Sequence, residues 1–473
     1  MSDDVNMSLL FQRVRFENPW WIDGHIEKTF DDMPRRGYFN LFRSVVDRED
    51  VRRAVVLMGP RRIGKTVMLH HYVDALIKDG VNPRKIIFIT VENPIYNGIM
   101  LEQLFQYAKE ASGISDSSGW HVIFDEIQYI KGWEIGLKVL IDSYFEDRFI
   151  VSGSAAAALK YASNESGAGR FTDFLLPPLT FSEFLKFSNR EQIMVSDNTA
   201  SIPMLDHYYS SPHIDELNRL FVDYINFVGY PELLFSGVGS DTGRYIRSDI
   251  IEKVLLRDLP GLYGISDTRE LNAIFTTIAW NSGNEFSLEG ISKESQVSKE
   301  TIRRYLEYLQ AAYLIKKLRR IDQGGKRFKR DNFFKLYLTN PALRAAIFTP
   351  LTAIDDHMGS MTETAIFSQS MDKPAYHPWY ARWRNGEVDM VNLSRINLKP
   401  ETAVEIKWSN RFYESPGELK SLYSFCKVNN IQNPVVTTID KTGVKEHKGF
   451  RIQYVPAAAY AYSYGLQAMQ DAG

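Results

Sequence analysis

The sequence predicts an α/β fold that begins with a parallel five-stranded sheet and continues through a helical region into a second α/β domain. Five short apolar segments are separated mostly by helical stretches, which is the pattern of a parallel sheet flanked by helices. These segments are "AVVLM", "IIFIT", "VIFD", "FIVSG" and "FLLPPL". A glycine-rich stretch follows the first segment, and two adjacent acids end the third. At 473 residues the chain is too long for one compact domain.

The composition is ordinary for a soluble globular protein, with 44% hydrophobic and 24% charged residues. The single cysteine, Cys426, excludes an internal disulfide framework and fits a reducing cytosol. No apolar stretch approaches the roughly 18 residues of a membrane span, and "MSDDVNMSLL" lacks the order of a signal peptide. We therefore expect a cytoplasmic protein with no membrane partner. The formal net charge of -2 means that any surface for nucleic acid must be local.

The glycine-rich stretch "GPRRIGKT" fits the phosphate-binding pattern G-x-x-x-x-G-K-[ST] between a strand and a helix. Its two glycines let backbone amides close around phosphate oxygens, aided by the positive end of the following helix. Lys65 is expected to reach the β- and γ-phosphates, and the Thr66 hydroxyl to bind Mg²⁺. A chance glycine-rich turn is the alternative, which this context disfavours. The predicted residues for ATP are Gly59, Pro60, Arg61, Arg62, Ile63, Gly64, Lys65, Thr66 and Val67.

Two adjacent acids end the third strand, in "HVIFDEIQYI". Asp125 can hold Mg²⁺, while Glu126 can orient or deprotonate the attacking water. Such a pair could also be surface residues, but the phosphate loop upstream favours a hydrolytic site. Lys65 and Glu126 are therefore predicted catalytic residues for the hydrolysis of ATP, with Mg²⁺ as a cofactor.

Two further catalytic residues are predicted between the fourth and fifth strands. Ser154 in "FIVSGSAAAALK" resembles a sensor residue that contacts the γ-phosphate or the water; the alternative is that it only caps a helix. Arg170 follows a flexible "GAG" and could act as an arginine finger on the nucleotide of a neighbouring subunit, or be an ordinary surface arginine. The finger role implies a homo-oligomer.

The order of six motifs resembles a family of bacterial and archaeal AAA-type ATPases with a C-terminal domain of unknown function 4143. The motifs are "NPWW", "GPRRIGKT", "FDEIQ", "SGSAA", "AGRF" and "PLTFSEF". The resemblance covers nearly the whole chain. A strand expected between the phosphate-loop strand and the acid strand is likewise similar to AAA+ proteins. Trp20 and Trp21 resemble the family's N-terminal pair, and we expect them to anchor the core rather than stack on adenine.

The segment after residue 270 shows a helix, a short helix, a third helix and a strand, which resembles a winged helix. Ser298 can cap the third helix. Apolar residues recur in that helix at three- or four-residue spacing, namely Ile302, Leu306, Leu309 and Tyr313. Between Lys299 and Lys335, twelve Lys or Arg stand against four Asp or Glu, an excess that favours contact with DNA phosphates. The alternative is a module that relays motion or mediates assembly.

The strand "AVEIKWS" places Glu405 and Lys407 on one face, because residues two apart on a strand point the same way. Asp389 on a preceding strand and Glu363 on a helix can converge with them. This order of helix Glu, strand Asp and Glu-x-Lys resembles the PD-(D/E)XK nuclease fold. The resemblance implies Mg²⁺ at Glu363, Asp389 and Glu405, and a catalytic Lys407. "EVD" departs from the "PD" of the pattern, and Glu387 is open to being a salt-bridge partner instead.

These observations predict a P-loop AAA-type ATPase domain, a helical lid, a winged helix and a C-terminal restriction-endonuclease-like α/β domain. The expected parts are an N-terminal segment 1–35, the ATPase domain 36–188, the lid 189–265, the winged helix 266–345 and the nuclease-like domain 346–473. The favoured function is ATP hydrolysis that gates the nuclease-like domain on DNA, in one version as defence against foreign DNA. The alternatives are a regulatory ATPase or interaction module that does not cleave, and a DNA-binding regulator.

Overall fold

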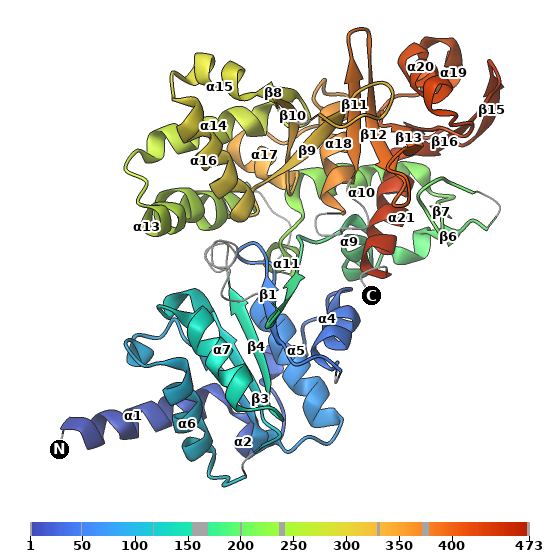
Figure 1. The fold of residues 1–473 in the computed structure, drawn as a ribbon. Helices are drawn as coiled ribbons and strands as arrows, with labels where there is room; N and C mark the ends of the chain where they lie inside the picture. The colour runs from blue at the N-terminus through green and yellow to red at the C-terminus, as the bar shows by residue number, and fades with distance from the viewer. Residues whose placement is uncertain are drawn as a thin grey trace. The chain divides into compact units, whose positions relative to one another are not determined.

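The computed structural model describes residues 2–48, 50–116, 118–153, 169–198, 201–235, 242–328, 332–370 and 378–470. The chain divides into two compact units, Met1–Leu176 and Pro177–Ala472 (Figure 1). None of the helices in these ranges combines the length and the apolar character that spanning a bilayer requires.

The first unit is built on a parallel five-stranded sheet with the order β2-β3-β4-β1-β5. Its strands are β1 (Ala54–Met58), β2 (Ile86–Thr90), β3 (His121–Asp125), β4 (Arg148–Gly153) and β5 (Phe171–Leu175). The sheet predicted from the sequence is confirmed, and β4 lies between β1 and β3 as expected. Only the fifth strand differs from its expected position in the sequence. It spans Phe171–Leu175, so it begins three residues before the expected segment "FLLPPL".

Helices flank this sheet along the chain (Figure 1). They are α1 (Ser2–Glu17), α2 (Trp20–Asp23), α3 (Lys28–Asp31), α4 (Phe39–Val46), α5 (Lys65–Lys78), α6 (Leu101–Ser112) and α7 (Trp133–Ser143). The indole N–H groups of Trp20 and Trp21 both donate to the Ile86 carbonyl, at 3.0 and 2.8 Å. The Asn18 side chain pairs with both backbone groups of Phe88, at 2.7 and 2.8 Å. The tryptophans are therefore core anchors that fasten the N-terminal segment to the edge strand β2.

The second unit contains a mixed nine-stranded sheet with the order β15-β16-β14-β13-β12-β11-β9-β10-β8. Its strands are β8 (Glu285–Ser287), β9 (Ile315–Ile321), β10 (Phe333–Leu338), β11 (Trp379–Trp383), β12 (Gly386–Leu393), β13 (Pro400–Glu405), β14 (Val435–Thr438), β15 (Gly443–His447) and β16 (Phe450–Pro456). Strands β9 and β11 pair in parallel, with Ala381 opposite Ile321. The expected winged helix and nuclease-like domain thus share one continuous sheet across the expected boundary at 345.

The helices of the second unit include two consecutive π-helical segments, η6 (Ile246–Glu252) and η7 (Val254–Asp258). The α-helices are α9 (Phe181–Phe187), α10 (Ile214–Phe227), α11 (Pro231–Phe235), α12 (Thr242–Tyr245), α13 (Leu259–Tyr263), α14 (Thr268–Trp280), α15 (Leu288–Ser295), α16 (Lys299–Ala311), α17 (Ala342–Ile347), α18 (Met358–Ser368), α19 (Arg411–Glu414), α20 (Lys420–Asn429) and α21 (Ala457–Gln470). The elements run in the order α14-β8-α15-α16-β9-β10, which is compatible with the expected winged helix, and that assignment stays a prediction. Ser298 caps α16 by accepting from Thr301 N at 3.1 Å. Tyr313 lies beyond the end of α16, at a positive φ of 55°, so it does not extend the buried helical face.

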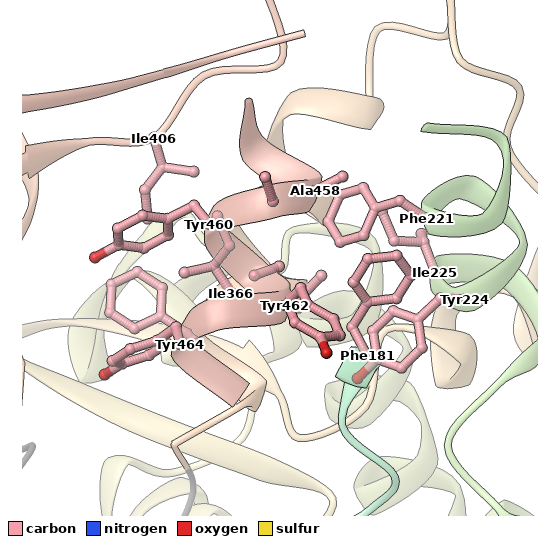
Figure 2. Packing of buried hydrophobic residues seen from close by; sticks show 14 of the residues in the cluster. Phe181, Phe221, Tyr224, Ile225, Ile366, Ile406, Ala458, Tyr460, Tyr462 and Tyr464 are labelled. Carbon is pink, nitrogen blue, oxygen red and sulfur yellow. The ribbon is translucent and has the colours of Figure 1, made fainter. Parts of the chain in front are cut away.

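Residues 189–265, expected to form a lid on the ATPase domain, belong to the second unit. Figure 2 shows Phe181 of α9 beside Phe221 and Tyr224 of α10, in a cluster that includes Tyr462 of α21. The Phe181 and Phe221 rings lie 5.1 Å apart, centre to centre. Burying these aromatic faces against one another ties α9 and α10 to this unit. For the same reason the first unit ends at Leu176, before the expected boundary at 188.

Candidate functional sites

The phosphate loop of the first unit joins β1 to α5 through backbone conformations that glycine favours. Gly59 has φ 150° and Gly64 has φ 89°. A Cβ atom at Gly59 would lie 2.3 Å from the Leu176 carbonyl oxygen and 2.6 Å from the Ile63 side chain. The Arg36 guanidinium donates to the Ile63 carbonyl at 2.8 Å and supports the loop from outside. The loop therefore has a fixed shape that no larger residue at position 59 could share.

Lys65, the first residue of α5, folds back over this loop. Its side chain is buried, and Nζ donates to the carbonyl oxygens of Gly59 and Pro60 at 3.1 and 3.0 Å. Burial lowers the pKa of the Lys65 ammonium, while the nearby acids Glu126 and Asp125 oppose this effect. A buried ammonium held by carbonyl oxygens can exchange these partners for phosphate oxygens, which are stronger acceptors. The residues present therefore fit a nucleotide phosphate.

Asp125 joins the phosphate loop to the neighbouring strands. The Thr66 hydroxyl donates to Asp125 Oδ2 at 2.8 Å, and the Ser152 hydroxyl donates to Oδ1. Burial and the adjacent Glu126 raise the pKa of the Asp125 carboxyl to about 6. A hydroxyl and a carboxylate that already touch are the oxygen donors that Mg²⁺ takes in phosphate-loop sites. Thr66 and Asp125 thus fit the metal as the sequence predicted, and that assignment stays a prediction.

Ser152, at the end of β4, is a residue that the sequence did not single out. Besides donating to Asp125, its hydroxyl accepts from Glu126 N at 3.2 Å. Glu126 has a positive φ of 58°, and the Gln128 side chain donates to its carboxylate. Ser152 therefore sets the position of both acids. The predicted sensor, Ser154, lies outside the described residues.

Arg170 lies on the surface of the first unit just before β5. Its guanidinium donates to both carboxylate oxygens of Asp142 on α7, at 2.7 and 3.4 Å. The two side chains are each more than two-fifths exposed. In this arrangement the arginine serves a surface ion pair, and the finger role stays a prediction.

The charged cluster of the second unit gathers Lys335 (β10), Glu363 (α18), Glu387 and Asp389 (β12), Glu405 (β13) and Lys407. Five of these side chains come from β10, β12 and β13 of the continuous sheet and from α18. Lys407 lies two residues beyond the end of β13, so it is not on the strand that "AVEIKWS" was expected to form. Lys407 Nζ lies 2.7 Å from Asp389 Oδ2 and 2.9 Å from Glu405 Oε1. The Ile406 backbone N–H also donates to Asp389 Oδ2, at 2.9 Å. The convergence of Asp389, Glu405 and Lys407 is the one that their spacing indicated.

Lys335 was counted in the sequence only as part of the lysine- and arginine-rich segment 299–335, here called the basic segment, yet it is 3% exposed and central to the cluster. Its Nζ lies 2.6 Å from Glu387 Oε1, 2.9 Å from Glu363 Oε1 and 3.8 Å from Asp389 Oδ1. The Tyr337 hydroxyl donates to Glu363 Oε1 as well. The signal in the sequence was a lysine inside the apolar strand "FFKLYL", where a buried charge requires partners.

Burial and the neighbouring lysines shift the pKa values of these acids in opposite directions. Burial raises the pKa of Glu405 to about 7, with a further contribution from Asp389, and it raises the pKa of Glu363. Burial acts in the same direction on Asp389, but the ammonium groups of Lys407 and Lys335 outweigh it and lower that pKa. Glu405 Oε2 is buried without a hydrogen-bond partner among the described residues, so it fits a cation.

The acids are, however, separated by the two lysines. Within the described ranges, no group of three or more His, Cys, Asp and Glu side chains is arranged to hold a metal ion. The structure thus brings together the predicted metal residues Glu363, Asp389 and Glu405, with ammonium groups between them. Metal binding at this cluster stays a prediction.

The basic segment, residues 299–335, lines most of a surface cavity of about 750 Å³ between α16 and β9. Residues of both signs line it, including Arg303, Glu307, Lys317 and Arg319, together with Trp379. Cations beside an aromatic ring suit the phosphates and bases of a nucleic acid.

Comparison with known families covers both units. Residues 51–185 match the model of a family described as an AAA domain. The chain carries an AAA domain. Residues 218–354 match a second model, described as a domain of unknown function (DUF8612), where the motif order implied domain of unknown function 4143. This second match ends before α18, so it leaves out the acids of the charged cluster.

Two similar proteins are described as uncharacterized. An uncharacterized protein of Haemophilus influenzae is 25% identical over 313 residues, which cover 65% of this chain and 72% of that one. An uncharacterized protein of Methanocaldococcus jannaschii is 24% identical over 420 residues, which cover 86% and 88%.

Two solved structures align at low identity. The Aeropyrum pernix ORC1 protein in complex with DNA aligns with a TM-score of 0.32 and 11% identity, over 69% of this chain and 95% of that one. AMPPCP-bound DnaA from Aquifex aeolicus aligns with a TM-score of 0.29 and 14% identity, over 62% and 92%. Alignments at these TM-scores assign no function to this chain.

Proposed function

We propose that the protein is an Mg²⁺-dependent ATPase that binds and hydrolyses ATP at the phosphate loop of its AAA domain. The observation that carries the proposal is the position of Asp125, which accepts from the Thr66 hydroxyl on one oxygen and from the Ser152 hydroxyl on the other. This contact joins the end of the acid strand to the start of α5. A phosphate loop, a metal-binding pair and a second acid then lie within one site.

The chain's own residues divide the work. Lys65 would leave the carbonyls of its loop for the β- and γ-phosphates, and the loop amides would receive the remaining oxygens. Thr66 and Asp125 would hold Mg²⁺, which neutralises charge on the phosphates when bound. Glu126 would orient the attacking water and accept its proton. Ser152 would keep the two acids in place throughout.

Substitution of Lys65 tests this site. Lys65→Met is expected to abolish ATP binding by the full chain, measured by calorimetry. Lys78→Met is the matched control, since Lys78 lies at the other end of α5 and pairs with Asp74 on its own helix. If Lys65→Met bound ATP as tightly as the control, the phosphate loop would not be the nucleotide site.

A second candidate function belongs to the charged cluster of the second unit. The convergence of Asp389, Glu405 and Lys407 supports an Mg²⁺-dependent nuclease-like centre, in which the acids hold the metal and the lysine activates water. The basic cavity beside α16 supports DNA as the substrate. The nucleotide state of the AAA domain would gate this centre, and Arg170 would leave Asp142 to act on a neighbouring subunit's nucleotide.

Plasmid degradation tests the second candidate. The full chain with Mg²⁺ and ATP is expected to cut DNA, and Lys407→Met is expected to stop cutting without slowing phosphate release. A wild-type protein that hydrolyses ATP but cuts neither DNA nor RNA would favour the alternative, a regulatory ATPase whose second unit only binds.

A further inference from the structure

We propose that the Lys335 ammonium group takes the place of a divalent cation in the charged cluster, so that this centre holds a single metal ion, on its Asp389–Glu405 side. The inference rests on the proposed nuclease-like centre and deepens it. In this proposal Glu363 and Glu387 are ion-pair partners of Lys335, whereas the sequence pattern implied that Glu363 is a metal ligand.

The contacts of Lys335 resemble the surroundings of a metal ion. Three carboxylate oxygens, from Glu363, Glu387 and Asp389, lie 2.6 to 3.8 Å from its Nζ. A lysine ammonium has three protons to donate, so it can satisfy two close acceptors and approach the third. Ca²⁺ or Mg²⁺ would draw such oxygens in to about 2.0–2.6 Å. The ammonium fills the same position at hydrogen-bond distances.

One carboxylate oxygen of Glu363 has little left to offer a metal. The Glu363 Oε1 atom accepts from both Lys335 Nζ and the Tyr337 hydroxyl, which uses both lone pairs of that oxygen. Lys335 and Tyr337 are neighbours on one face of β10 and are both almost fully buried. The strand therefore presents a cation and a hydroxyl to the same carboxylate.

The opposite side of the cluster is different. Lys407 lies between Asp389 Oδ2 and Glu405 Oε1, and it is the more exposed of the two lysines, at 28% against 3%. Glu405 Oε2 is buried without a hydrogen-bond partner among the described residues. A rotation of the Lys407 side chain would free two carboxylates for one cation. A second cation near Glu363 would have to displace the buried ammonium, because like charges repel strongly where water is excluded.

Binding of Mn²⁺ to the nucleotide-free full chain tests this assignment, with the number of ions and their affinity measured by calorimetry and by the electron paramagnetic resonance signal of free Mn²⁺. The number of ions bound by Asp389→Asn is subtracted from the number bound by the wild type, so that the difference counts only the ions of the charged cluster. Glu363→Gln is expected to keep the wild-type affinity, whereas loss of a true ligand weakens binding roughly tenfold or more. Lys335→Met is expected to gain one further Mn²⁺ ion.

Thermal unfolding gives a second measurement that does not depend on counting ions. Lys335→Met removes the ammonium that lies closest to the buried Glu363 carboxylate and within 3.8 Å of Glu387 and Asp389. Its unfolding temperature should therefore fall, and Mn²⁺ should restore it. Lys293→Met is the matched control, because Lys293 is exposed and pairs with Glu289 on its own helix. Mn²⁺ should change the unfolding temperature of this variant by the same amount as it changes that of the wild type.

The outcomes separate the two proposals. The assignment of Lys335 would be wrong if Glu363→Gln weakened Mn²⁺ binding roughly tenfold, as loss of a metal ligand does. It would also be wrong if Lys335→Met bound no further ion and Mn²⁺ did not raise its unfolding temperature. Neither result would exclude the nuclease-like centre. If Asp389→Asn bound as many Mn²⁺ ions as the wild type, the metal centre itself would be absent, and both proposals would fail.

Discussion

Removal of the Ser152 hydroxyl should shift the pH range in which the protein binds Mg-ATP. The hydroxyl donates to Asp125, and both residues are almost fully buried. A hydrogen bond to a charged group contributes about 1.5–3 kcal/mol, and one pKa unit corresponds to about 1.4 kcal/mol. Ser152→Ala should therefore raise the pKa of Asp125 from about 6 by roughly one to two units. Half or more of the Asp125 carboxyls would then be protonated at pH 7.

The sign of the effect follows from competition between the proton and the metal. Only the ionised Asp125 carboxylate holds Mg²⁺, so affinity is full above its pKa and is lost as the pH falls through it. The wild-type protein should lose affinity for Mg-ATP below about pH 6, and Ser152→Ala below about pH 7 to 8.

The dissociation constant of Mg-ATP between pH 5 and 9 is the assay. Ser112→Ala is the matched control. The Ser112 hydroxyl likewise donates to one oxygen, Lys109 O, and accepts from one backbone N–H, that of Ile114, and Ser112 is far from the phosphate loop in the sequence. Ser152→Thr keeps the hydroxyl and should restore the wild-type profile. A Ser152→Ala protein with an unshifted profile would show that Ser152 does not hold Asp125.

Three further substitutions have defined outcomes. Gly59→Ala should weaken ATP binding by about fivefold to 150-fold, since overpacking costs about 1–3 kcal/mol. Gly80→Ala, also at a positive φ but with open space around it, should leave ATP binding unchanged in the same titration. Asp389→Ala should abolish Mg²⁺-dependent plasmid cleavage and leave phosphate release within about twofold, since Asp389 belongs to the second unit and the phosphate-loop residues belong to the first; cleavage that persisted would exclude this cluster. Arg170→Ala should lower turnover by about a thousandfold without changing ATP affinity, as loss of an arginine finger does; a wild-type rate at every protein concentration would leave Arg170 a surface residue.

The local motifs were predictable because they act through neighbours in the sequence. The phosphate loop, the acid strand and the five-stranded sheet follow from apolar runs, glycine positions and strand–loop–helix order. The role of Ser152 could not be predicted in this way, because "SGS" offers two serines and their spacing along the strand does not say which one reaches the acids. The parallel register of β3 and β4, with Phe124 opposite Val151, places Ser152 beside Asp125.

The charged cluster shows what long-range contacts add. Glu363, Asp389, Glu405 and Lys407 were predicted to converge, since one helix and two strands were expected to carry them. The structure ends β13 at Glu405, so Lys407 lies just beyond the strand. Lys335 was missed because its partners lie tens of residues away, and only the tertiary structure shows that a lysine from a basic segment is buried among acids. The parallel pairing of β9 with β11, which fuses two expected domains into one sheet, is likewise invisible to local patterns.

The most direct test of the central claim measures ATP binding and phosphate release on the same preparations of wild-type protein and Glu126→Gln. The wild type should bind Mg-ATP and release phosphate. Glu126→Gln should bind with similar affinity and release phosphate at least about a hundredfold more slowly, because it lacks the general base. A wild-type protein that binds ATP without turnover, or a Glu126→Gln protein that turns over at the wild-type rate, would contradict the assignment of this site as an ATPase.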